Sequence, residues 1–323
     1  MKLEKPRGRR GFTIVEALVS VAIIGLLVGL ILPAVQIARE SARKTECRAH
    51  LRELCSAVAN FESQHGVLPP ERAKGGFRSP LIEILPMVDQ AAYYHQVLRE
   101  GVPTSYLPED PVSRRRPVLA ILRCPSDQQA LGTNFRFNHG CDVLGSDEEG
   151  KGRGPLSTPA TPSSQVTDGL SNTVIMSEAV MSPNGPHSFH RGDAWYSGLG
   201  SQRVPRPSND DVVSLCQEAA ASPAPFYPYV GHDWAISGLG HAGYNHVLPP
   251  NGTVLNCRLD GPQLNGAMDH YWPVGILKAS SYHHGGVNVV MLDGSARFIS
   301  NSIDLSVWQA ISTRADGEPT AEF

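Results

Sequence analysis

A single carboxylate, Glu16, lies inside the most apolar stretch of the sequence. It is the only charged residue in residues 12–35, whose other interruptions are Thr13, Ser20 and Pro33. An ionised acid at membrane depth is costly and is usually paired with a cation. We therefore expect Glu16 to be matched by a positive charge when this stretch is buried.

Six of the 12 histidines occur in three pairs with aspartates near them in the sequence, and such a pattern could hold a metal ion. These residues are His187 and His190, His241 and His246, His283 and His284, with Asp193, Asp233, Asp269 and Asp293. Their spacing matches neither a metalloprotease helix nor a Cys/His zinc site. A Ca²⁺ ion held by aspartate and carbonyl oxygens would suit them better. We predict no metal and no cofactor, and we name His283, His284 and Asp293 as the candidates should an ion bind.

The sequence also lacks the marks of nucleophilic catalysis and of nucleic-acid binding. It contains no G-x-S-x-G elbow and no cysteine with an evident base partner. The formal net charge is −3, and no basic stripe carries interleaved aromatic residues. We predict that the protein is not an enzyme and has no nucleic-acid partner, and we rank a hydrolase third among the functional alternatives.

The elements that must position Glu16 are a basic leader and an apolar helix. Residues 1–11 contain five Lys or Arg and one Glu. As a helix, residues 12–35 would be roughly 36 Å long, enough to cross a bilayer core of about 30 Å. The basic leader predicts that the N-terminus stays in the cytoplasm and the rest is exported. A cleaved secretory signal has only a weak site after Ala34, and a plain anchor leaves Glu16 unexplained.

A third interpretation comes from the phrase RRGFTIVEALVSVAIIGLLVGLILPAV, residues 9–35. This phrase resembles the prepilin signal of type IV pilins and type II secretion pseudopilins. The resemblance implies that prepilin peptidase cuts between Gly11 and Phe12 and that the new amino group is methylated. Glu16 would then be matched by the amine of Phe12, supplied by a neighbouring subunit. We favour this interpretation over the other two.

The helix is expected to continue beyond the apolar segment. Residues at helical spacing form an apolar stripe that consists of Leu51, Leu54, Cys55, Val58 and, at its edge, Phe61. Gly66 and the pair Pro69-Pro70 should end the helix. The pattern predicts one helix from about Thr13 to Glu62, with a kink at Pro33 because proline removes a backbone hydrogen bond.

The rest of the chain indicates a β-rich head, because nearly all of the 31 Gly and 26 Pro residues follow His65. Five phrases stand out in it: SPLIEILPMVDQAAYYHQV (79–97), LRCPSD (122–127), TNFRFNHGC (133–141), VTDGLSNTVIMSE (166–178) and HHGGVNVVMLDGSARFIS (283–300). Together with the prepilin-like start, they resemble the DUF1559 family, pilin-like proteins abundant in planctomycete bacteria.

The resemblance implies an α+β, pilin-like fold. A long N-terminal α-helix, transmembrane and then packed on the head, would be followed by a β-rich C-terminal globular head. We divide the chain into a leader (1–11), a transmembrane or assembly helix (12–35), an amphipathic continuation (36–65) and the head (66–323). Residues 198–279 match the family less clearly, and we expect an insertion there.

Local patterns within the head predict fold rather than catalysis. The last phrase predicts a β-hairpin in which Val287, Val289 and Met291 alternate with Asn288, Val290 and Leu292. Asp293-Gly294 would supply both positive-φ positions of a type I′ turn. We also expect a buried strand near Thr173–Met176, a helix over residues 79–97, and a short closing helix capped by Ser302 or Asp304.

An even number of cysteines, six, favours disulfides in an exported head. Cys47 and Cys55 lie too far apart on one helix to pair with each other. In the resembling family a stalk cysteine and the CPSD cysteine recur, which implies Cys47–Cys124. Cys216–Cys257 would tie the expected insertion, and Cys55–Cys141 is a third pair to consider. The alternative is buried free thiols.

The leading functional hypothesis is an exported, membrane-anchored pilin- or pseudopilin-like structural subunit. Its N-terminus would lie inside the cytoplasm and its head outside, in the periplasm or at the cell surface. Its partners would be prepilin peptidase, the cytoplasmic membrane and other pilin-like subunits or copies of itself. The alternative is an anchored binding module for a glycan, a peptide or a metal ion. Loop aromatics that would line its site are Trp195, Tyr196, Tyr227, Tyr229, Trp234, Tyr244, Tyr271 and Trp272.

Overall fold

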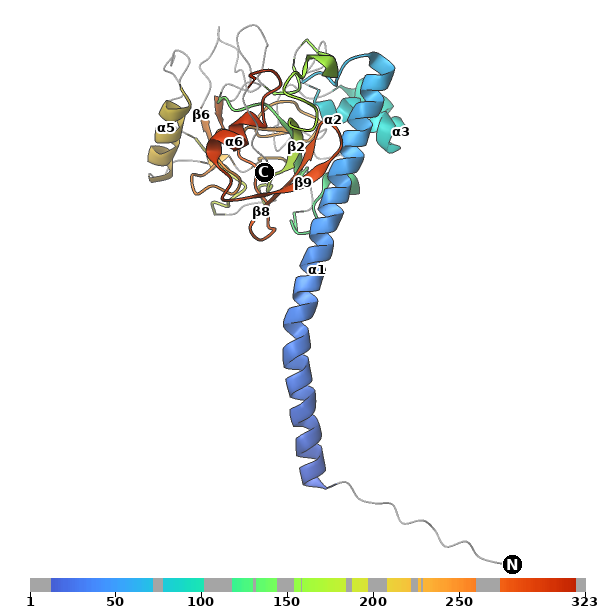
Figure 1. Cartoon of the computed structure of the whole chain (residues 1–323), viewed down its shortest axis with the longest axis vertical. Coiled ribbons are helices and arrows are strands. Elements are labelled where there is room, and N and C mark those ends of the chain that lie inside the picture. The colour runs from blue at the N-terminus through green and yellow to red at the C-terminus, as the bar shows by residue number, and fades with distance from the viewer. Residues whose placement is uncertain are drawn as a thin grey trace, which may run out of the picture. The chain divides into compact units, whose positions relative to one another are not determined.

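The structure is a computed structural model in which one long helix precedes a head of short strands and loops (Figure 1). It describes residues 13–71, 78–101, 118–129, 132–143, 154–157, 159–183, 188–196, 208–221, 226–227, 229–259 and 274–317. The chain divides into two compact units, residues 1–43 and 44–323. The boundary falls within helix α1, Ile14–His65, so the second part of this helix belongs to the head unit.

The first unit contains the apolar part of α1. Every Val, Leu and Ile from Ile14 to Ile37 is at least 41% exposed. By length and composition, α1 is the one described helix that is able to cross a membrane. Pro33 lies inside this helix. The single helix predicted from about Thr13 to Glu62 is confirmed, and it ends three residues later than expected, at His65.

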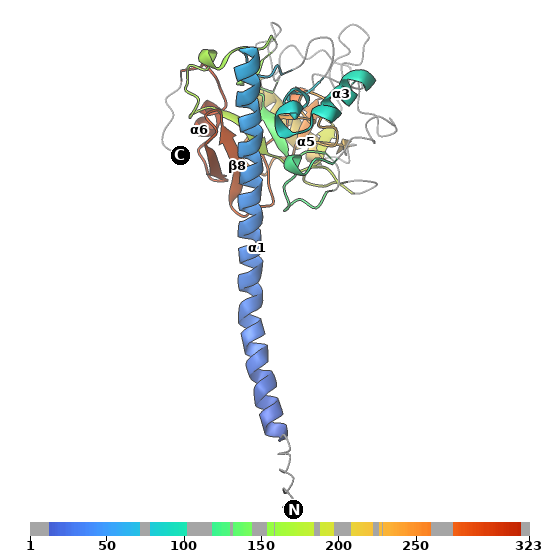
Figure 2. The same cartoon turned by 90° about the vertical axis from the view of Figure 1, so that its right-hand side faces the viewer.

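The second unit is built around a five-stranded sheet with the strand order β5-β1-β2-β8-β9. Its strands are β1 (Phe135–Asn138), β2 (Val174–Glu178), β5 (Gly243–Tyr244), β8 (Gly286–Met291) and β9 (Ala296–Ser300). All pairings are antiparallel except β1 with β5. Figures 1 and 2 both show the head part of α1 beside this sheet.

Side chains that alternate along β8 fill a separate core on each face of the sheet. Val290 packs in the core that contains Leu51, Leu54 and Val58 of α1. Val287, Val289 and Met291 pack with Trp308 of α6, Leu305–Ala310, on the other face. The period-2 pattern of the sequence therefore holds, and the fold class is confirmed as α+β.

The hairpin between β8 and β9 has a different turn from the one expected. Gly294 has a positive φ of 86°, but Asp293 does not. The Gly294 N–H donates to the carbonyl of Met291 at 3.0 Å, and the Met291 N–H donates to that of Ser295 at 2.9 Å. This is a type I turn followed by a left-handed glycine, the usual three-residue hairpin loop, rather than a type I′ turn.

The helix expected over residues 79–97 is also divided. It consists of α2 (Pro80–Glu83), the 3₁₀ helix η1 (Leu85–Val88) and α3 (Ala91–Glu100). Pro86 lacks the N–H that would continue α2, and Asp89 ends η1 in the left-handed conformation at φ 59°. The closing helix α6 has Asp304 as its cap, whose side chain accepts from the Ser306 N–H.

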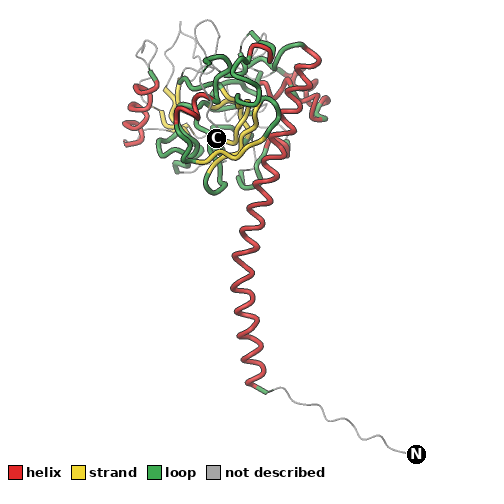
Figure 3. The backbone as a smooth tube through the Cα atoms, viewed as in Figure 1, coloured by secondary structure: helices red, strands yellow, loops and turns green. Residues whose placement is uncertain are grey.

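A second sheet, with the order β4-β3-β6-β7, comes largely from residues 198–279. Its strands are β4 (Phe226–Tyr227), β3 (Ala194–Tyr196), β6 (Cys257–Leu259) and β7 (Val274–Ile276). Helix α5, Asn209–Ala221, packs Val212 and Cys216 in a core with Cys257 and Ile276. The remaining elements among the described residues are two short 3₁₀ helices, η2 (Ala120–Leu122) and η3 (Ser163–Gln165), and loops make up much of the head (Figure 3).

Candidate functional site

The N-terminal acid, Glu16, takes part in a capping box at the start of α1. Its Oε2 accepts from the backbone N–H and from the hydroxyl of Thr13, both at 2.9 Å. The Glu16 N–H donates back to Thr13 Oγ1 at 3.3 Å. The sequence carries the T-x-x-E signature of this motif, which predicts a local capping role for Glu16 in addition to the expected cationic partner. Gly11 and Phe12 lie outside the described residues.

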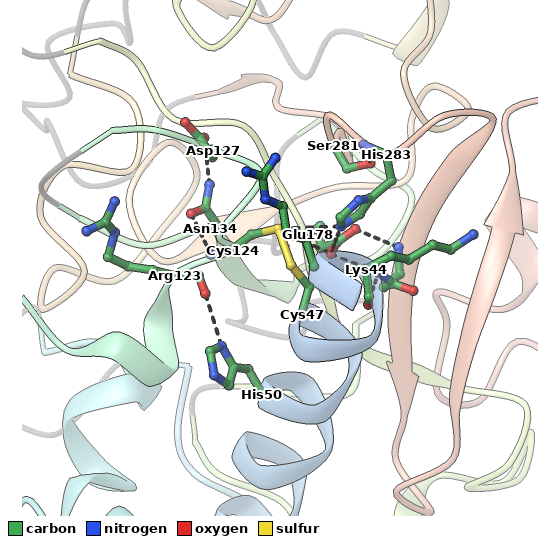
Figure 4. Close-up of a disulfide and its surroundings, with 12 residues drawn as sticks. Lys44, Cys47, His50, Arg123, Cys124, Asp127, Asn134, Glu178, Ser281 and His283 are labelled. Atoms are coloured by element: carbon green, nitrogen blue, oxygen red, sulfur yellow. Dashed lines mark hydrogen bonds and ion pairs between the residues drawn. A yellow bond between two sulfur atoms is a disulfide. The ribbon is translucent and has the colours of Figure 1, made fainter. Parts of the chain in front are cut away.

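The head contains a buried group of ligand-type side chains, Cys47, Cys124, Glu178 and His283, which we call the buried cluster. It is assembled from α1, the segment after η2, the end of β2 and the segment before β8. Figure 4 shows Glu178 and His283 directed toward the sulfur atoms of Cys47 and Cys124. None of the four is more than 4% exposed.

Glu178 is the most heavily hydrogen-bonded member of the buried cluster. Its Oε2 accepts from the Asn288 backbone N–H at 2.8 Å, and its Oε1 from the Asn288 side-chain amide at 2.9 Å. The His283 Nε2 lies 3.1 Å from the same Oε1. These partners compensate a carboxylate that burial would otherwise make costly. Glu178 ends a buried apolar strand, which is the sequence signal that could have identified it.

The buried cluster includes one of two disulfides. Cys47 pairs with Cys124, and Cys216 with Cys257. The third pair, Cys55–Cys141, is not formed between these two described residues. The Cys55 thiol instead donates to the Met291 carbonyl at 3.3 Å, which places it under the sheet. Burial raises the pKa of this thiol to about 12, so it is protonated and unreactive at neutral pH.

Lys44 lies at the edge of the buried cluster, at the start of the head part of α1. Its Nζ sits 3.0 Å from the centroid of the Phe298 ring, a cation–π contact. Partial burial and the nearby Arg48 lower the pKa of Lys44, whereas Glu178 acts in the opposite direction. The Asn288 amide also donates to the Lys44 carbonyl at 3.4 Å, which ties β8 to α1.

A larger, open pocket of about 430 Å³ lies on the outer side of His283, and we call it the outer pocket. Its lining includes two basic side chains, Arg191 and Lys278, and no acidic side chain among its described residues. Arg191 is held by the Asn251 side chain at 2.8 Å. Burial, with a smaller contribution from Arg191, lowers the pKa of Lys278 to about 8. The pocket is therefore suited to an anionic group.

The three metal candidates from the sequence are not brought together. His283 joins the buried cluster, His284 lines the outer pocket, and Asp293 lies in the β8–β9 turn, where it accepts from the Ser295 N–H. His246 is a core residue, bonded to the Trp308 carbonyl at 2.7 Å and to the Tyr244 hydroxyl at 2.8 Å. His187 and Asp269 lie outside the described residues.

Among the aromatic residues proposed for a binding site, none whose side chain the structure describes lines the outer pocket. Trp234 and Tyr244 are buried in the core, and Trp195 stacks on Phe189 with the ring centroids 4.6 Å apart. Tyr282, which is not among the predicted aromatic residues, does line the outer pocket. Tyr271 and Trp272 lie outside the described residues.

The long apolar N-terminal helix and the α+β head together have the architecture of a membrane-anchored protein of the pilin-like class. A family model of the prokaryotic N-terminal methylation motif matches residues 6–32. A second model, described as a protein of unknown function (DUF1559), matches residues 36–306. The chain therefore belongs to the DUF1559 family. No curated protein and no solved structure matches it.

Proposed function

We propose that the chain is a pilin- or pseudopilin-like structural subunit, cleaved by prepilin peptidase between Gly11 and Phe12 and methylated at the new amino group. The cleaved helix anchors it in the cytoplasmic membrane, with the N-terminus inside and the head in the periplasm or at the cell surface. Subunits associate through the apolar part of α1, either as copies of this chain or with other pilin-like proteins. No catalytic activity is assigned to the head.

One observation carries this proposal: the methylation motif coincides with a helix whose apolar side chains are uncovered. The motif spans residues 6–32, and the Val, Leu and Ile side chains from Ile14 to Ile37 are exposed in the single chain. Such a continuous apolar surface requires lipid or other helices around it. The basic leader supports the proposed orientation.

Processing is tested by the mature N-terminus of the protein isolated from membranes. Mass spectrometry is expected to find N-methylated Phe12 as the first residue. Gly11→Val should block cleavage and retain residues 1–11. An unchanged N-terminus in this variant would contradict the proposal.

The role of Glu16 in assembly is tested with two variants that separate charge from helix capping. Glu16→Gln removes the charge but retains a side chain that completes a capping box. Thr13→Ala removes the hydroxyl of the same box and leaves the charge. If Glu16 matches a neighbour's amine, only Glu16→Gln should lower the yield of crosslinked or sheared assemblies at equal cleavage. Equal yields from both variants and wild type would remove this role.

A second candidate function, an anchored binding module, is favoured by the outer pocket. Arg191 and Lys278 line it, which suits a carboxylate of an acidic glycan or of a peptide. A screen of the full chain on an array of acidic and neutral glycans and peptides should give acidic hits. These hits should be lost in Arg191→Gln and kept in Arg297→Gln, a control on β9. Because Lys278 is charged only below its pKa of about 8, binding should weaken as the pH rises above that value.

A further inference from the structure

The buried cluster contains four metal-ligand types at one point in the head. One ligand atom each from Cys47, Cys124, Glu178 and His283 lies within 4.8 Å of all the others. Two thiolates, an imidazole and a carboxylate form a complete donor set for tetrahedral Zn²⁺. The sequence separates these residues so widely that no short zinc motif could reveal them.

The separations between ligand atoms already resemble those of a coordination tetrahedron. With typical bond lengths, tetrahedral zinc places N and O ligands roughly 3.3 Å apart, and S and N or O ligands roughly 3.6 Å apart. In the structure, His283 Nε2 lies 3.1 Å from Glu178 Oε1 and 3.4 Å from Cys124 Sγ. Cys124 Sγ lies 3.9 Å from Glu178 Oε1. Three of the four ligands therefore need shifts of only a few tenths of an ångström.

The fourth ligand depends on the oxidation state of the cysteines. As a disulfide, the two sulfur atoms share a bond and cannot both bind a metal as thiolates. Reduction by a dithiol takes two electrons and two protons to give two thiols, while the reductant becomes a disulfide. Binding of Zn²⁺ then releases the two thiol protons. With the Cα atoms 5.1 Å apart, the sulfurs can separate to the roughly 3.8 Å of two zinc-bound thiolates by side-chain rotation.

The surroundings provide the outer support and the access that a metal site requires. The backbone N–H and the side-chain amide of Asn288 both donate to Glu178, and the His283 backbone N–H donates to Ser281 Oγ at 3.1 Å. A small pocket of about 10 Å³, enough for one water or ion, is lined by Cys124, Glu178 and Ser281. Ser281 and Tyr282 line both this small pocket and the outer pocket, so the buried cluster lies next to an opening to solvent.

We propose that Cys47, Cys124, Glu178 and His283 form a closed Zn²⁺ site when the Cys47–Cys124 disulfide is reduced. The disulfide and the metal are then alternative ties between the head part of α1 and the rest of the head. All four positions are protein ligands, so the site stabilises structure and leaves no position for substrate. This proposal does not depend on filament assembly or on the binding of a ligand in the outer pocket.

The test uses the full chain in detergent, reduced under anaerobic conditions with a phosphine, treated with a chelator and then freed of both. Added Zn²⁺ should bind with one ion per chain and protect Cys47 and Cys124 from alkylation, as shown by peptide mass spectrometry. Cys216 and Cys257 are buried, and their alkylation should be the same with and without Zn²⁺. Co²⁺ in place of Zn²⁺ should give a thiolate charge-transfer absorption. The oxidised chain should bind neither ion at this site.

Ligand variants sharpen the assignment. His283→Gln and Glu178→Gln should each weaken Zn²⁺ binding by more than the 10- to 100-fold typical of losing an outer-shell partner. His284→Gln, at the neighbouring outer-pocket residue, should bind as wild type. The alkylation experiment needs no variant, so it decides the question even if a ligand variant fails to fold.

Three results would overturn the proposal. The first is a reduced wild-type chain that binds no Zn²⁺. The second is protection that depends on Zn²⁺ at cysteines other than Cys47 and Cys124. The third is unchanged affinity in both folded ligand variants.

Discussion

The two parts of helix α1 form one continuous helix but differ in what covers them. Before residue 38 the apolar side chains are exposed; after residue 44 a stripe containing Leu51, Leu54 and Val58 is at most 1% exposed, packed in the head core. The helical backbone is the same, so the difference lies in the neighbours. The apolar side chains of the head part are covered by the rest of the chain, whereas those of the first part can be covered only by lipid or by other subunits.

Because of this difference, substitutions in the two parts of α1 should affect different measured properties. Changes in the head part should alter the free energy of unfolding of the head. Changes in the apolar part should alter membrane retention or assembly and leave the head intact. The variants below test that separation, in order of decreasing expected effect.

The largest effect is expected from removing the disulfide that joins α1 to the head. Cys47→Ser with Cys124→Ser removes a bond between residues 77 positions apart in the sequence, and the chain-entropy model gives a loss of about 4.5 kcal/mol. Urea unfolding in detergent, followed by tryptophan fluorescence, measures it. Membrane retention in alkaline extraction should not change. A loss below about 1 kcal/mol would mean that the head part of α1 does not depend on this tie.

A matched pair of leucines tests the separation along the helix directly. Leu51 is fully buried, whereas Leu27 is 51% exposed. Leu51→Ala should lower the free energy of unfolding of the head by about 3 kcal/mol, the usual cost of a buried cavity. Leu27→Ala should change it by less than about 0.5 kcal/mol. Similar losses in the two variants would contradict the division of α1.

Much of this division is predictable from the sequence, because it rests on periodicity. The apolar run, the stripe from Leu51 to Phe61 and the alternation along β8 are local patterns with one structural solution each. The turn at Asp293-Gly294 was predicted wrongly because the dipeptide fits two hairpin loops, and strand register chooses between them. The helix over residues 79–97 forms separate pieces because Pro86 lacks the N–H that would continue α2 and Asp89 is left-handed, and the apolar spacing does not register these breaks.

The buried cluster was not predictable in the same way. His283 is one of the three metal candidates in the sequence, with His284 and Asp293, but its partner Glu178 ends a strand 105 positions away along the chain. Only the pairing of β2 with β8 places the two strands side by side, and that pairing depends on the whole sheet. When a site is assembled by the pairing of distant strands, its residues form no short sequence motif, so the site cannot be predicted from residue spacing.

An intermediate effect is expected from pH, and it should come from the head. Burial lowers the pKa of His246 to about 3, against the opposing effect of its bond to the Trp308 carbonyl. The unfolded chain takes up this proton below about pH 6.5, but the folded chain does not until about pH 3. The free energy of unfolding should therefore fall by about 1.4 kcal/mol per unit as the pH drops below 6.5, with no contribution above it.

Unfolding of wild type at pH 7 and pH 5 measures the slope due to His246. His246→Asn keeps an amide that can donate to the Trp308 carbonyl in place of Nδ1, but it does not titrate, so its slope should be shallower. His95→Asn, at an exposed position on α3, should retain the wild-type slope. If His246→Asn and wild type have the same slope, the acid sensitivity does not come from this residue.

The smallest effect compares two helix caps of similar chemistry, one in each unit. Asp304 caps α6 by accepting from the Ser306 N–H at 2.8 Å, and Thr13 forms the capping box with Glu16 at the start of α1. Asp304→Ala should lower the Tm of the head by about 2 °C, because α6 unfolds with the head core. Thr13→Ala should leave that Tm unchanged and only speed hydrogen exchange in the first turn of α1.

The two caps are informative because each substitution removes a similar capping hydrogen bond. What differs is whether the capped helix end unfolds together with the head. A capping group stabilises whatever cooperative unit contains its helix end. If α1 were one unit with the head along its whole length, Thr13→Ala would lower the Tm of the head as Asp304→Ala does. Faster exchange in the first turn with an unchanged Tm would place the N-terminal cap in a part of the helix that the head does not stabilise, where a neighbouring subunit or the membrane is free to do so.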